Sequence, residues 1–327
     1  MPPAKSSGLP SERVLTLGTY LRTLRNAPKG LRSRFASKLL PDLFRRSVRS
    51  EAASCVFDTL DNYPAKYRLL AQLLGRPGKN PPPDELTFLR SIENYAGRGG
   101  TIHFGDCLFL TAFVSILAPP RAIEIGTLGG FSAAVIAAAI RWQHPDEKRI
   151  LVETIDRNIH SLLEPDKPVG FLLPEMFPAF SDAVRVHVPA DSGTVREFAG
   201  RDELGFAFID ADHQHPRPLL DLVRLAPFLR CGAWVVFHDI RLGTHTAEKG
   251  DLESLAYGAP FGAEWFFQAW PFRKISGGNI GAVQIPADKS EMIAPALRLM
   301  DLPFEVNPGN DARRDRRALH QSLVELW

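Results

Sequence analysis

Short runs rich in Val and Ile alternate with helical stretches from residue 121 onward, and this alternation restricts the fold more than any other feature of the sequence. The strand-like runs cover 121–126, 149–156, 183–190, 204–210 and 233–239. Apolar stretches with helical spacing, such as 131–142 and 216–230, lie between them. Because parallel strands must be joined by a crossover, βα units of this length predict a doubly wound, mostly parallel sheet with helices on both faces.

The segments on either side of this region extend the predicted α/β fold. Two late runs, 263–270 and 279–286, look like a closing hairpin at the sheet edge, which makes the predicted sheet seven-stranded. Helices are predicted at 51–74, 83–97, 106–120 and 311–327, and three consecutive prolines mark a linker within 73–85. The predicted parts are a basic arm over 1–50, a helical N-terminal extension over 51–118, the α/β domain over 119–287 and a C-terminal helical tail over 288–327.

The composition is that of a folded protein without a membrane span. Hydrophobic residues make up 45% of the 327 residues, enough for a buried core, and no stretch reaches the roughly 18 apolar residues of a membrane span. Cys55, Cys107 and Cys231 are odd in number and far apart, which argues against a disulfide framework and favours a reducing, cytoplasmic location. The net charge of +2 gives no clear sign of nucleic-acid binding, and a homo-oligomer is left open.

Residues 1–50 differ in charge from the rest of the chain. They hold eleven Lys and Arg against two acids, Glu12 and Asp42, and are rich in Ser. This composition is typical both of an organelle transit peptide and of a flexible basic arm. We expect the arm to be poorly ordered and dispensable for ligand binding.

Polar residues follow each predicted strand of the alternating region at its carboxyl end. They are Glu124 to Gly130, Asp156, Asp191 with Ser192, Asp210, and His238 with Asp239. Ligands of doubly wound sheets bind beyond these ends, near the reversal of strand order. The densest group is "FIDADHQHP", 208–216, where two acids and two histidines directly follow an apolar strand. Desolvating this group would be costly unless it bound something.

The stretch "EIGTLGGFS", 124–132, predicts a strand-to-helix turn at which a ligand approaches the backbone, because it contains Gly126, Gly129 and Gly130. Position 128 is Leu, where a nicotinamide or flavin site expects a further glycine. A tight turn that needs glycine only for its own conformation is the alternative. Asp156, one βα unit later, is either a ligand of ribose hydroxyls or a solvated strand-end acid.

Five motifs in order, "RAIEIGTLGGFS", "VETID", "VPADSG", "FAFIDADHQHP" and "FLRCGAWVVFHD", resemble the class I S-adenosylmethionine-dependent methyltransferases. The resemblance is to the branch of cation-dependent O-methyltransferases and their sugar-modifying relatives, and it covers about 119–285. It implies a Rossmann-like methyltransferase fold with S-adenosylmethionine as cofactor. The cofactor-binding residues that it implies are Glu124, Gly126 and Gly130 at the methionine moiety, Asp156 at the ribose, Asp191 and Ser192 by the adenine, and Ser132 and Asp210 elsewhere in the site.

The same resemblance implies a base and a metal site. Cation-dependent members carry Asp-x-Asp-Lys after the fourth strand, with the first Asp on the metal and the Lys as base, whereas this chain has "DADH" at 210–213. Sugar-modifying relatives have a His at that point, so His213 is the implied base. The usual ligand pair of the fifth strand falls on His238 and Asp239, which with Asp210 would hold a divalent cation such as Mg or Mn. Because Mg²⁺ prefers oxygen ligands, the imidazole leaves a softer ion, or none, as alternatives.

The predicted activity is methyl transfer to a hydroxyl of a small acceptor. An imidazole that titrates near neutrality suits removal of the hydroxyl proton, and a divalent cation would lower the pKa of a coordinated hydroxyl. One alternative is a nicotinamide-dependent oxidoreductase, against which the Leu at 128 and the lack of a Tyr-x-x-x-Lys pair both argue. Another is a cofactor-binding scaffold protein without catalysis.

Other conspicuous residues have simpler interpretations. His215, which precedes Pro216, is interpreted as a loop residue, and Asp221 as a solvated or capping acid. The aromatic residues of the late apolar run are expected to form core rather than an acceptor-binding wall. They are Trp265, Phe266, Phe267 and Trp270.

Overall fold

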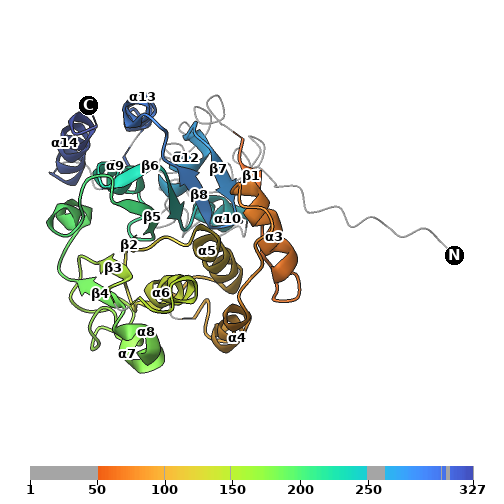
Figure 1. The fold of residues 1–327 in the computed structure, drawn as a ribbon. Coiled ribbons are helices and arrows are strands. Elements are labelled where there is room, and N and C mark those ends of the chain that lie inside the picture. Colours follow the sequence, from red (N-terminus) through yellow and green to blue (C-terminus); the bar gives the residue numbers. More distant parts are fainter. Residues whose placement is uncertain are drawn as a thin grey trace.

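A mixed sheet of eight strands, in the order β1-β7-β8-β6-β5-β2-β3-β4, runs through the protein in a computed structural model (Figure 1). The structure describes residues 51–98, 100–147, 149–248, 262–302, 304–306 and 310–326, so the predicted basic arm lies outside the described residues. The strands are β1 (Ala53–Ser54), β2 (Ala122–Ile125), β3 (Val152–Ile155), β4 (Val184–His187), β5 (Leu204–Ile209), β6 (Leu229–Phe237), β7 (Lys274–Ser276) and β8 (Gly281–Gln284).

The central part of the sheet is parallel and reverses its winding direction next to β2. From β2 the chain proceeds outward to β3 and β4, and it then returns to place β5 and β6 on the other side of β2. This arrangement confirms the predicted doubly wound sheet. It also places the switch in strand order between β2 and β5, where ligands of such sheets bind.

Helices cover both faces of the sheet. Successive residues of a strand point to opposite faces, so a strand that is buried on both sides contributes side chains to two hydrophobic clusters. Phe206 and Phe208 of β5 pack into one hydrophobic cluster, and Ala207 and Ile209 pack into the other. The first cluster lies under α3 (Tyr63–Leu73), α4 (Pro83–Ile92), α5 (Phe104–Leu117), α6 (Phe131–Gln143) and α7 (Leu172–Met176). The second lies under α9 (Arg217–Leu225), α12 (Gly262–Ala269), α13 (Ile293–Met300) and α14 (Asn310–Val324). Shorter elements are α8 (Pro178–Ser181), α10 (Leu242–Glu248), and the 3-10 turns η1 (Ser192–Glu197) and η2 (Lys289–Met292).

The edge hairpin differs from the prediction in its first strand. The run 263–270 forms helix α12, and the strand that pairs antiparallel with β8 is β7, within the predicted connection. A short run dominated by aromatic and other apolar residues is difficult to assign to strand or buried helix from its periodicity. The aromatic side chains of this helix are buried in the second cluster, as expected for core. They are Trp265, Phe266 and Phe267, with Trp270 directly after the helix.

The N-terminal extension also departs from the prediction, because residues 51–62 are not helical. Ala53 and Ser54 form β1, which pairs parallel with β7 and gives the sheet its eighth strand. Helix α3 begins only at Tyr63, with Pro64 in its first turn, where the missing N–H of proline costs no helical hydrogen bond. The linker between α3 and α4 and the C-terminal helix are as predicted.

A buried polar group lies where α3, α4 and α5 meet. The Tyr63 hydroxyl donates a hydrogen bond to Oε1 of Glu85, and the Tyr67 hydroxyl lies 3.2 Å from Oγ of Ser115. The side chain of Glu85 is fully buried, and its Oε2 atom has no hydrogen-bond partner in the described part of the chain. Burial raises the pKa of Glu85 to about 7, although hydrogen bonds from Tyr63 and Ser115 act in the opposite direction.

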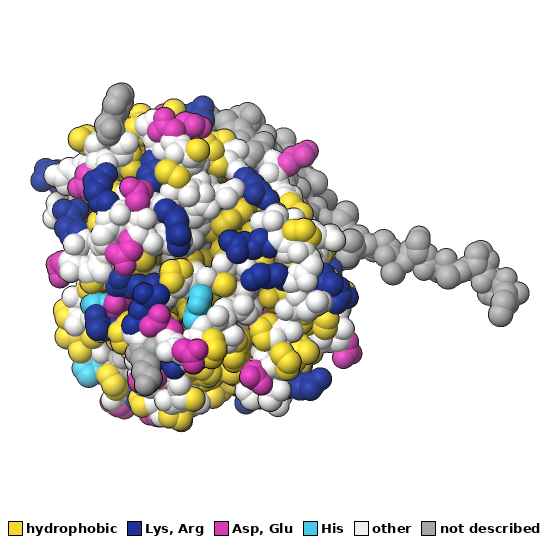
Figure 2. All heavy atoms as spheres, viewed as in Figure 1, with side chains coloured by type: hydrophobic (Ala, Val, Ile, Leu, Met, Phe, Trp, Pro, Cys, Tyr) yellow, Lys and Arg dark blue, Asp and Glu magenta, His cyan; other side chains and the backbone are white. Residues whose placement is uncertain are grey.

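The surface is mixed in character. Figure 2 shows Lys, Arg, Asp and Glu side chains interspersed with hydrophobic ones over the visible face. Among the described residues, no helix is long and apolar enough to cross a membrane.

Candidate active site

A cavity of about 770 Å³ opens at the carboxyl ends of β2, β3, β5 and β6. Its lining includes most of the residues predicted to form the site. These are Gly126, Ser132, Asp156, Asp191, Ser192, Asp210, His213, His238 and Asp239. Glu124 and Gly130 do not contribute to the lining. The volume lies within the range of small-molecule and cofactor pockets.

The turn after β2 brings the backbone close to the cavity and to the neighbouring strand. Gly126 has a φ of +102°, and a Cβ atom added to it would lie 2.2 Å from the carbonyl oxygen of Asp210. Only glycine fits there, so the turn passes directly over the end of β5. Leu128 also has a positive φ, of 47°, which is rare for a residue with a bulky side chain.

Glu124 lies beneath this turn and is completely buried. Thr154 donates a hydrogen bond to its Oε2 at 2.5 Å, whereas Oε1 has no hydrogen-bond partner among the described residues. Burial raises the pKa of Glu124 to about 8, against the opposing effect of hydrogen bonds from Ser132 and Thr154. Glu124 is therefore a buried carboxyl that supports the turn from the side away from the cavity.

Asp156 is held at the end of β3 by three hydrogen bonds. The backbone N–H of Leu128 donates to Oδ2 at 3.0 Å, and the backbone and side chain of Asn158 donate to Oδ1 at 2.8 and 3.1 Å. The carboxylate therefore joins the ends of β2 and β3. Each oxygen keeps acceptor capacity for hydroxyl groups in the cavity, which fits the ribose of the implied cofactor.

Asp191 and Ser192 follow β4 and lie beside two arginines. Nη1 of Arg224 is 3.2 Å and Nη2 of Arg157 is 3.9 Å from Oδ2 of Asp191. Burial acts to raise the pKa of Asp191, but the Gly193 N–H and the arginines outweigh it and lower that pKa. Asp191 is therefore a fixed anion at this wall of the cavity.

Asp221 differs from its predicted role as a solvated or capping acid. It is only 5% exposed, it accepts a hydrogen bond from Oγ of Ser192 at 2.6 Å, and it contributes to the cavity lining. Burial raises its pKa to about 6. The prediction failed because an acid on an amphipathic helix was assumed to face solvent, whereas α9 turns this residue toward the cavity.

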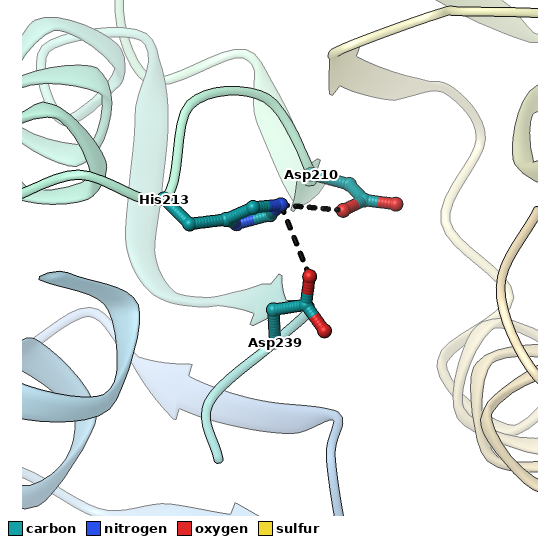
Figure 3. Close-up of side chains that lie close together, drawn as sticks. All are labelled: Asp210, His213 and Asp239. Carbon is teal, nitrogen blue, oxygen red and sulfur yellow. Dashed lines mark ion pairs between the residues drawn. The ribbon is translucent and has the colours of Figure 1, made fainter. Parts of the chain in front are cut away.

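Asp210, His213 and Asp239 form a compact group at the ends of β5 and β6 (Figure 3). Nε2 of His213 lies 3.2 Å from Oδ2 of Asp239 and 3.6 Å from Oδ1 of Asp210. Asn279 donates a hydrogen bond to the other oxygen of Asp239 at 2.6 Å. One potential ligand atom from each of Asp210, His213 and Asp239 lies within 4.8 Å of the others, close enough to share a metal ion.

His238 is placed differently from the other predicted metal ligands. Its Nδ1 lies 3.1 Å from Oδ1 of Asp210, and its Nε2 lies 3.2 Å from Oδ2 of Asp106. Burial acts to lower the pKa of His238, but the carboxylates of Asp210, Asp106 and Asp239 raise it well above its ordinary value. Both ring nitrogens are thus engaged by carboxylates, and His213 takes its place in the group of potential ligands.

Asp106 is a site residue that the sequence reasoning missed. It lies in the first turn of α5, which belongs to the predicted N-terminal helical extension, and it is 5% exposed. The available signal was that Asp106 is the only charged residue in the apolar helix "FGDCLFLTAFVSIL". A lone buried acid in such a helix requires a partner, and His238 supplies it.

The two remaining members of the "DADHQHP" group, Asp212 and His215, make contacts that hold the loop, although Asp212 also lines the cavity. Asp212 forms an ion pair with Arg217, which also contacts Asp315 of α14 at 3.2 Å. His215 lies in a loop as predicted, but it is only 1% exposed and packs against Trp265. Burial lowers the pKa of His215 to about 4, so it is neutral at physiological pH.

Comparisons with known proteins concern the same part of the chain as this cavity. Residues 123–240 match the family described as a methyltransferase domain. No curated protein matches the sequence closely enough to be called a relative.

Similar solved structures include cofactor-bound Rv0187 from MTB, which is 20% identical with a TM-score of 0.42 and covers 69% of this chain and 98% of its own. An O-methyltransferase from Bacillus cereus in complex with SAH is 16% identical with a TM-score of 0.41, and covers 69% of this chain and 100% of its own. The O-methyltransferase TomG from Streptomyces achromogenes, in complex with SAM, is 15% identical with a TM-score of 0.41, and covers 70% of this chain and 99% of its own.

The matched segment contains β2 to β6, the glycine turn, and the Asp210, His213 and Asp239 group. Its sheet is the doubly wound one that the sequence motifs implied, and its cavity lies at the switch in strand order. Residues 123–240 therefore match a methyltransferase domain, in agreement with the resemblance of the sequence motifs to the class I S-adenosylmethionine-dependent methyltransferases.

Proposed function

We propose that the protein transfers the methyl group of S-adenosylmethionine to a hydroxyl oxygen of a small acceptor, with His213 as the base. The observation that carries this proposal is that Asp210, His213 and Asp239 line the same cavity as Gly126 and Asp156. A proton acceptor and a cofactor-binding turn thus share one space. Their proximity is what a displacement at a bound methyl group requires.

The cofactor would supply an electrophilic methyl group on a sulfonium centre. Asp156 would accept hydrogen bonds from its ribose hydroxyls, and Asp191 with Ser192 would lie by its adenine. The turn at Gly126, with Ser132 and Asp210, would face its methionine moiety. Neither Glu124 nor Gly130 lines the cavity, so each would support the conformation of the turn rather than contact the cofactor.

His213 would remove the proton of the acceptor hydroxyl as its oxygen forms a bond to the methyl carbon and the carbon–sulfur bond breaks. Asp239 lies 3.2 Å from Nε2 of His213, so a hydrogen bond from Nε2 leaves Nδ1 as the nitrogen that accepts the proton. Asp239 and Asp210 then stabilise the imidazolium that forms. A positioned base of this kind typically contributes about 10²–10⁴-fold to the rate.

The same residues could instead bind a divalent cation. One potential ligand atom from each of them lies within 4.8 Å of the others, which favours such a site. Asp210, His213 and Asp239 would hold the ion, which would lower the pKa of a bound hydroxyl. Two carboxylates and one imidazole suit Mn²⁺ or a softer ion better than Mg²⁺. The two uses of His213 are exclusive at Nε2, because an atom that binds a metal cannot also donate to Asp239.

Calorimetry and turnover of the full chain test the proposal together. We expect His213→Ala to bind S-adenosylmethionine within about twofold of the unmodified protein while its transfer rate to a panel of phenols and sugars falls at least 100-fold. His320→Ala, which removes an exposed imidazole on α14, is the matched control and should change neither quantity. Retained turnover in His213→Ala would show that this histidine is structural.

A strong chelator separates the base from the metal ligand. Activity that persists in the chelator supports His213 as the base without an ion. Activity that is lost, and that returns on addition of Mn²⁺ in the unmodified protein but not in Asp239→Asn, assigns His213 to the ion instead. Cofactor binding without transfer to any hydroxyl acceptor would support the scaffold alternative and refute the proposed function.

A further inference from the structure

Three apolar side chains of one short segment project into solvent, and one of them lines the cavity. Ile159, Leu162 and Leu163 are 55%, 72% and 48% exposed, and we call them the apolar rim. They occur within five consecutive residues of the segment after β3. Single exposed apolar residues are common, but a contiguous group beside a ligand cavity marks a binding surface.

Backbone hydrogen bonds hold the rim in place. The N–H of Val169 donates to the carbonyl of Ile159 at 2.9 Å, and the N–H of Ser161 donates to the carbonyl of Lys167 at 2.9 Å. The base of the loop is joined to the glycine turn, because the N–H of Gly170 donates to the carbonyl of Leu128 at 2.9 Å. The apolar side chains are therefore presented by an ordered loop that is tied to the cofactor turn.

The apolar rim meets the cavity through Leu162. Leu162 is 72% exposed and also contributes to the cavity lining. Apolar side chains from three other segments, Ile102, Leu128 and Leu242, line the same cavity. The amino-acid and ribose parts of S-adenosylmethionine are polar, and they match the acids and the glycine turn rather than these residues.

The charges beside the rim restrict what can lie on it. The same loop and the following helix present the exposed acids Glu164, Asp166 and Glu175, and Lys167 is paired with two of them. With Arg157 and Lys167 against three acids, residues 157–175 carry no excess of basic side chains that would attract an anionic lipid surface. A neutral hydrocarbon does not depend on such charges.

We propose that the acceptor is amphipathic, with a hydroxyl-bearing head that reaches His213 and an uncharged hydrocarbon body that lies on the apolar rim. This inference rests on the proposed function and names its substrate class. The hydrocarbon body covers Leu162 and its neighbours, so that each added CH2 group removes apolar surface from water. Complete burial of one CH2 group corresponds to roughly fourfold in affinity, which is the upper limit for each step of a homologous series.

The test uses phenol, 4-butylphenol and 4-hexylphenol with the full chain. Binding is measured by calorimetry in the presence of S-adenosylhomocysteine, and transfer is measured with S-adenosylmethionine. We expect the dissociation constant to fall at least tenfold from phenol to 4-butylphenol, with kcat/KM rising in parallel. Leu162→Ser should reduce this dependence on chain length severalfold. Val324→Ser is the matched control, because Val324 is 70% exposed on α14 and does not line the cavity, and it should leave the dependence intact.

The outcomes distinguish this inference from the proposed function. Methylation of all three phenols without dependence on chain length overturns the amphipathic acceptor and leaves O-methylation standing. Binding that depends on chain length, without transfer, supports the rim and overturns the proposed reaction. A dimer in sedimentation that Leu162→Ser dissociates, or binding to anionic vesicles that Leu162→Ser abolishes, would show that the rim serves another partner and would overturn the inference.

Discussion

Replacement of Glu85 by Gln is expected to stabilise the protein at alkaline pH and to have little effect at acidic pH. Glu85 is fully buried between α3, α4 and α5, with its Oε2 atom unpartnered in the described part of the chain. Burial raises its pKa from an ordinary value of 4.5 to about 7. The folded protein thus favours the protonated, neutral form, which Gln resembles in shape and lack of charge.

The size and sign of the effect follow from this difference in pKa. Because the pKa of Glu85 is higher in the folded than in the unfolded chain, the stabilisation by its protonated form is complete below about pH 4.5. It is lost as the pH rises toward and through about 7. The full difference corresponds to roughly 3 kcal/mol of unfolding free energy, so Glu85→Gln should gain about that much relative to the unmodified protein between pH 4.5 and pH 8.5.

Urea unfolding followed by tryptophan fluorescence, at several pH values in this range, measures the difference directly. Comparing two proteins at each pH removes the contribution of the other titrating groups. Asp84→Asn, an exposed carboxylate on the same helix, is the matched control and should stay within about 0.5 kcal/mol at every pH. A stability difference for Glu85→Gln that does not change between pH 4.5 and pH 8.5 would refute the assignment of a buried neutral carboxyl.

Three further predictions concern the cofactor site. Asp156→Ala should weaken S-adenosylmethionine binding at least about tenfold in calorimetry, because a hydrogen-bonding carboxylate contributes roughly 1.5–3 kcal/mol. Asp182→Ala, which removes an exposed carboxylate, should not weaken binding. Equal affinities of Asp156→Ala and the unmodified protein would exclude the ribose role of Asp156. Gly126→Ala should lower the midpoint of thermal unfolding far more than Gly75→Ala. Both glycines have a positive φ, but only a Cβ atom at 126 would meet backbone, 2.2 Å from the carbonyl oxygen of Asp210. Similar midpoints for the two variants would contradict this close approach. Deletion of residues 1–50 should leave cofactor affinity within about twofold, because a distant arm adds little differential binding energy, and a large loss would show that the arm contributes to the site.

The parts of the site that are local in sequence could be predicted, and those that depend on tertiary placement could not. Asp156, Asp210 and Asp239 end strands that the Val and Ile runs identify, so their common edge of the sheet follows from the parallel fold. The contact between Asp106 and His238 joins residues 132 positions apart and leaves no local pattern. The grouping of His213, rather than the predicted ligand His238, with Asp210 and Asp239 also depends on tertiary geometry, because Asp239 has a left-handed φ of 57° that no neighbouring residue signals.

The edge of the sheet also contains features that depend on tertiary packing and could not be predicted from the sequence. The run "AEWFFQAW" is short and dominated by aromatic residues, so its periodicity does not clearly separate a helix from a strand, and packing in the surrounding core decides between them. The two residues of β1 are too short to produce a pattern and are defined by their pairing with β7. Both differences lie away from the cavity, and the predicted location of the site was unaffected by them.

The left-handed backbone at Leu128 has a consequence for how the protein would respond to selection. A leucine in this conformation carries conformational strain of order 1 kcal/mol or more, and glycine would relieve it. A library screened for heat resistance alone should therefore enrich Leu128→Gly, and with it remove a side chain from the cavity wall. Under the proposed function, stability and the shape of the cavity would compete at this position, so a thermostable variant selected without an activity screen would be expected to lose discrimination among acceptors before it lost its fold.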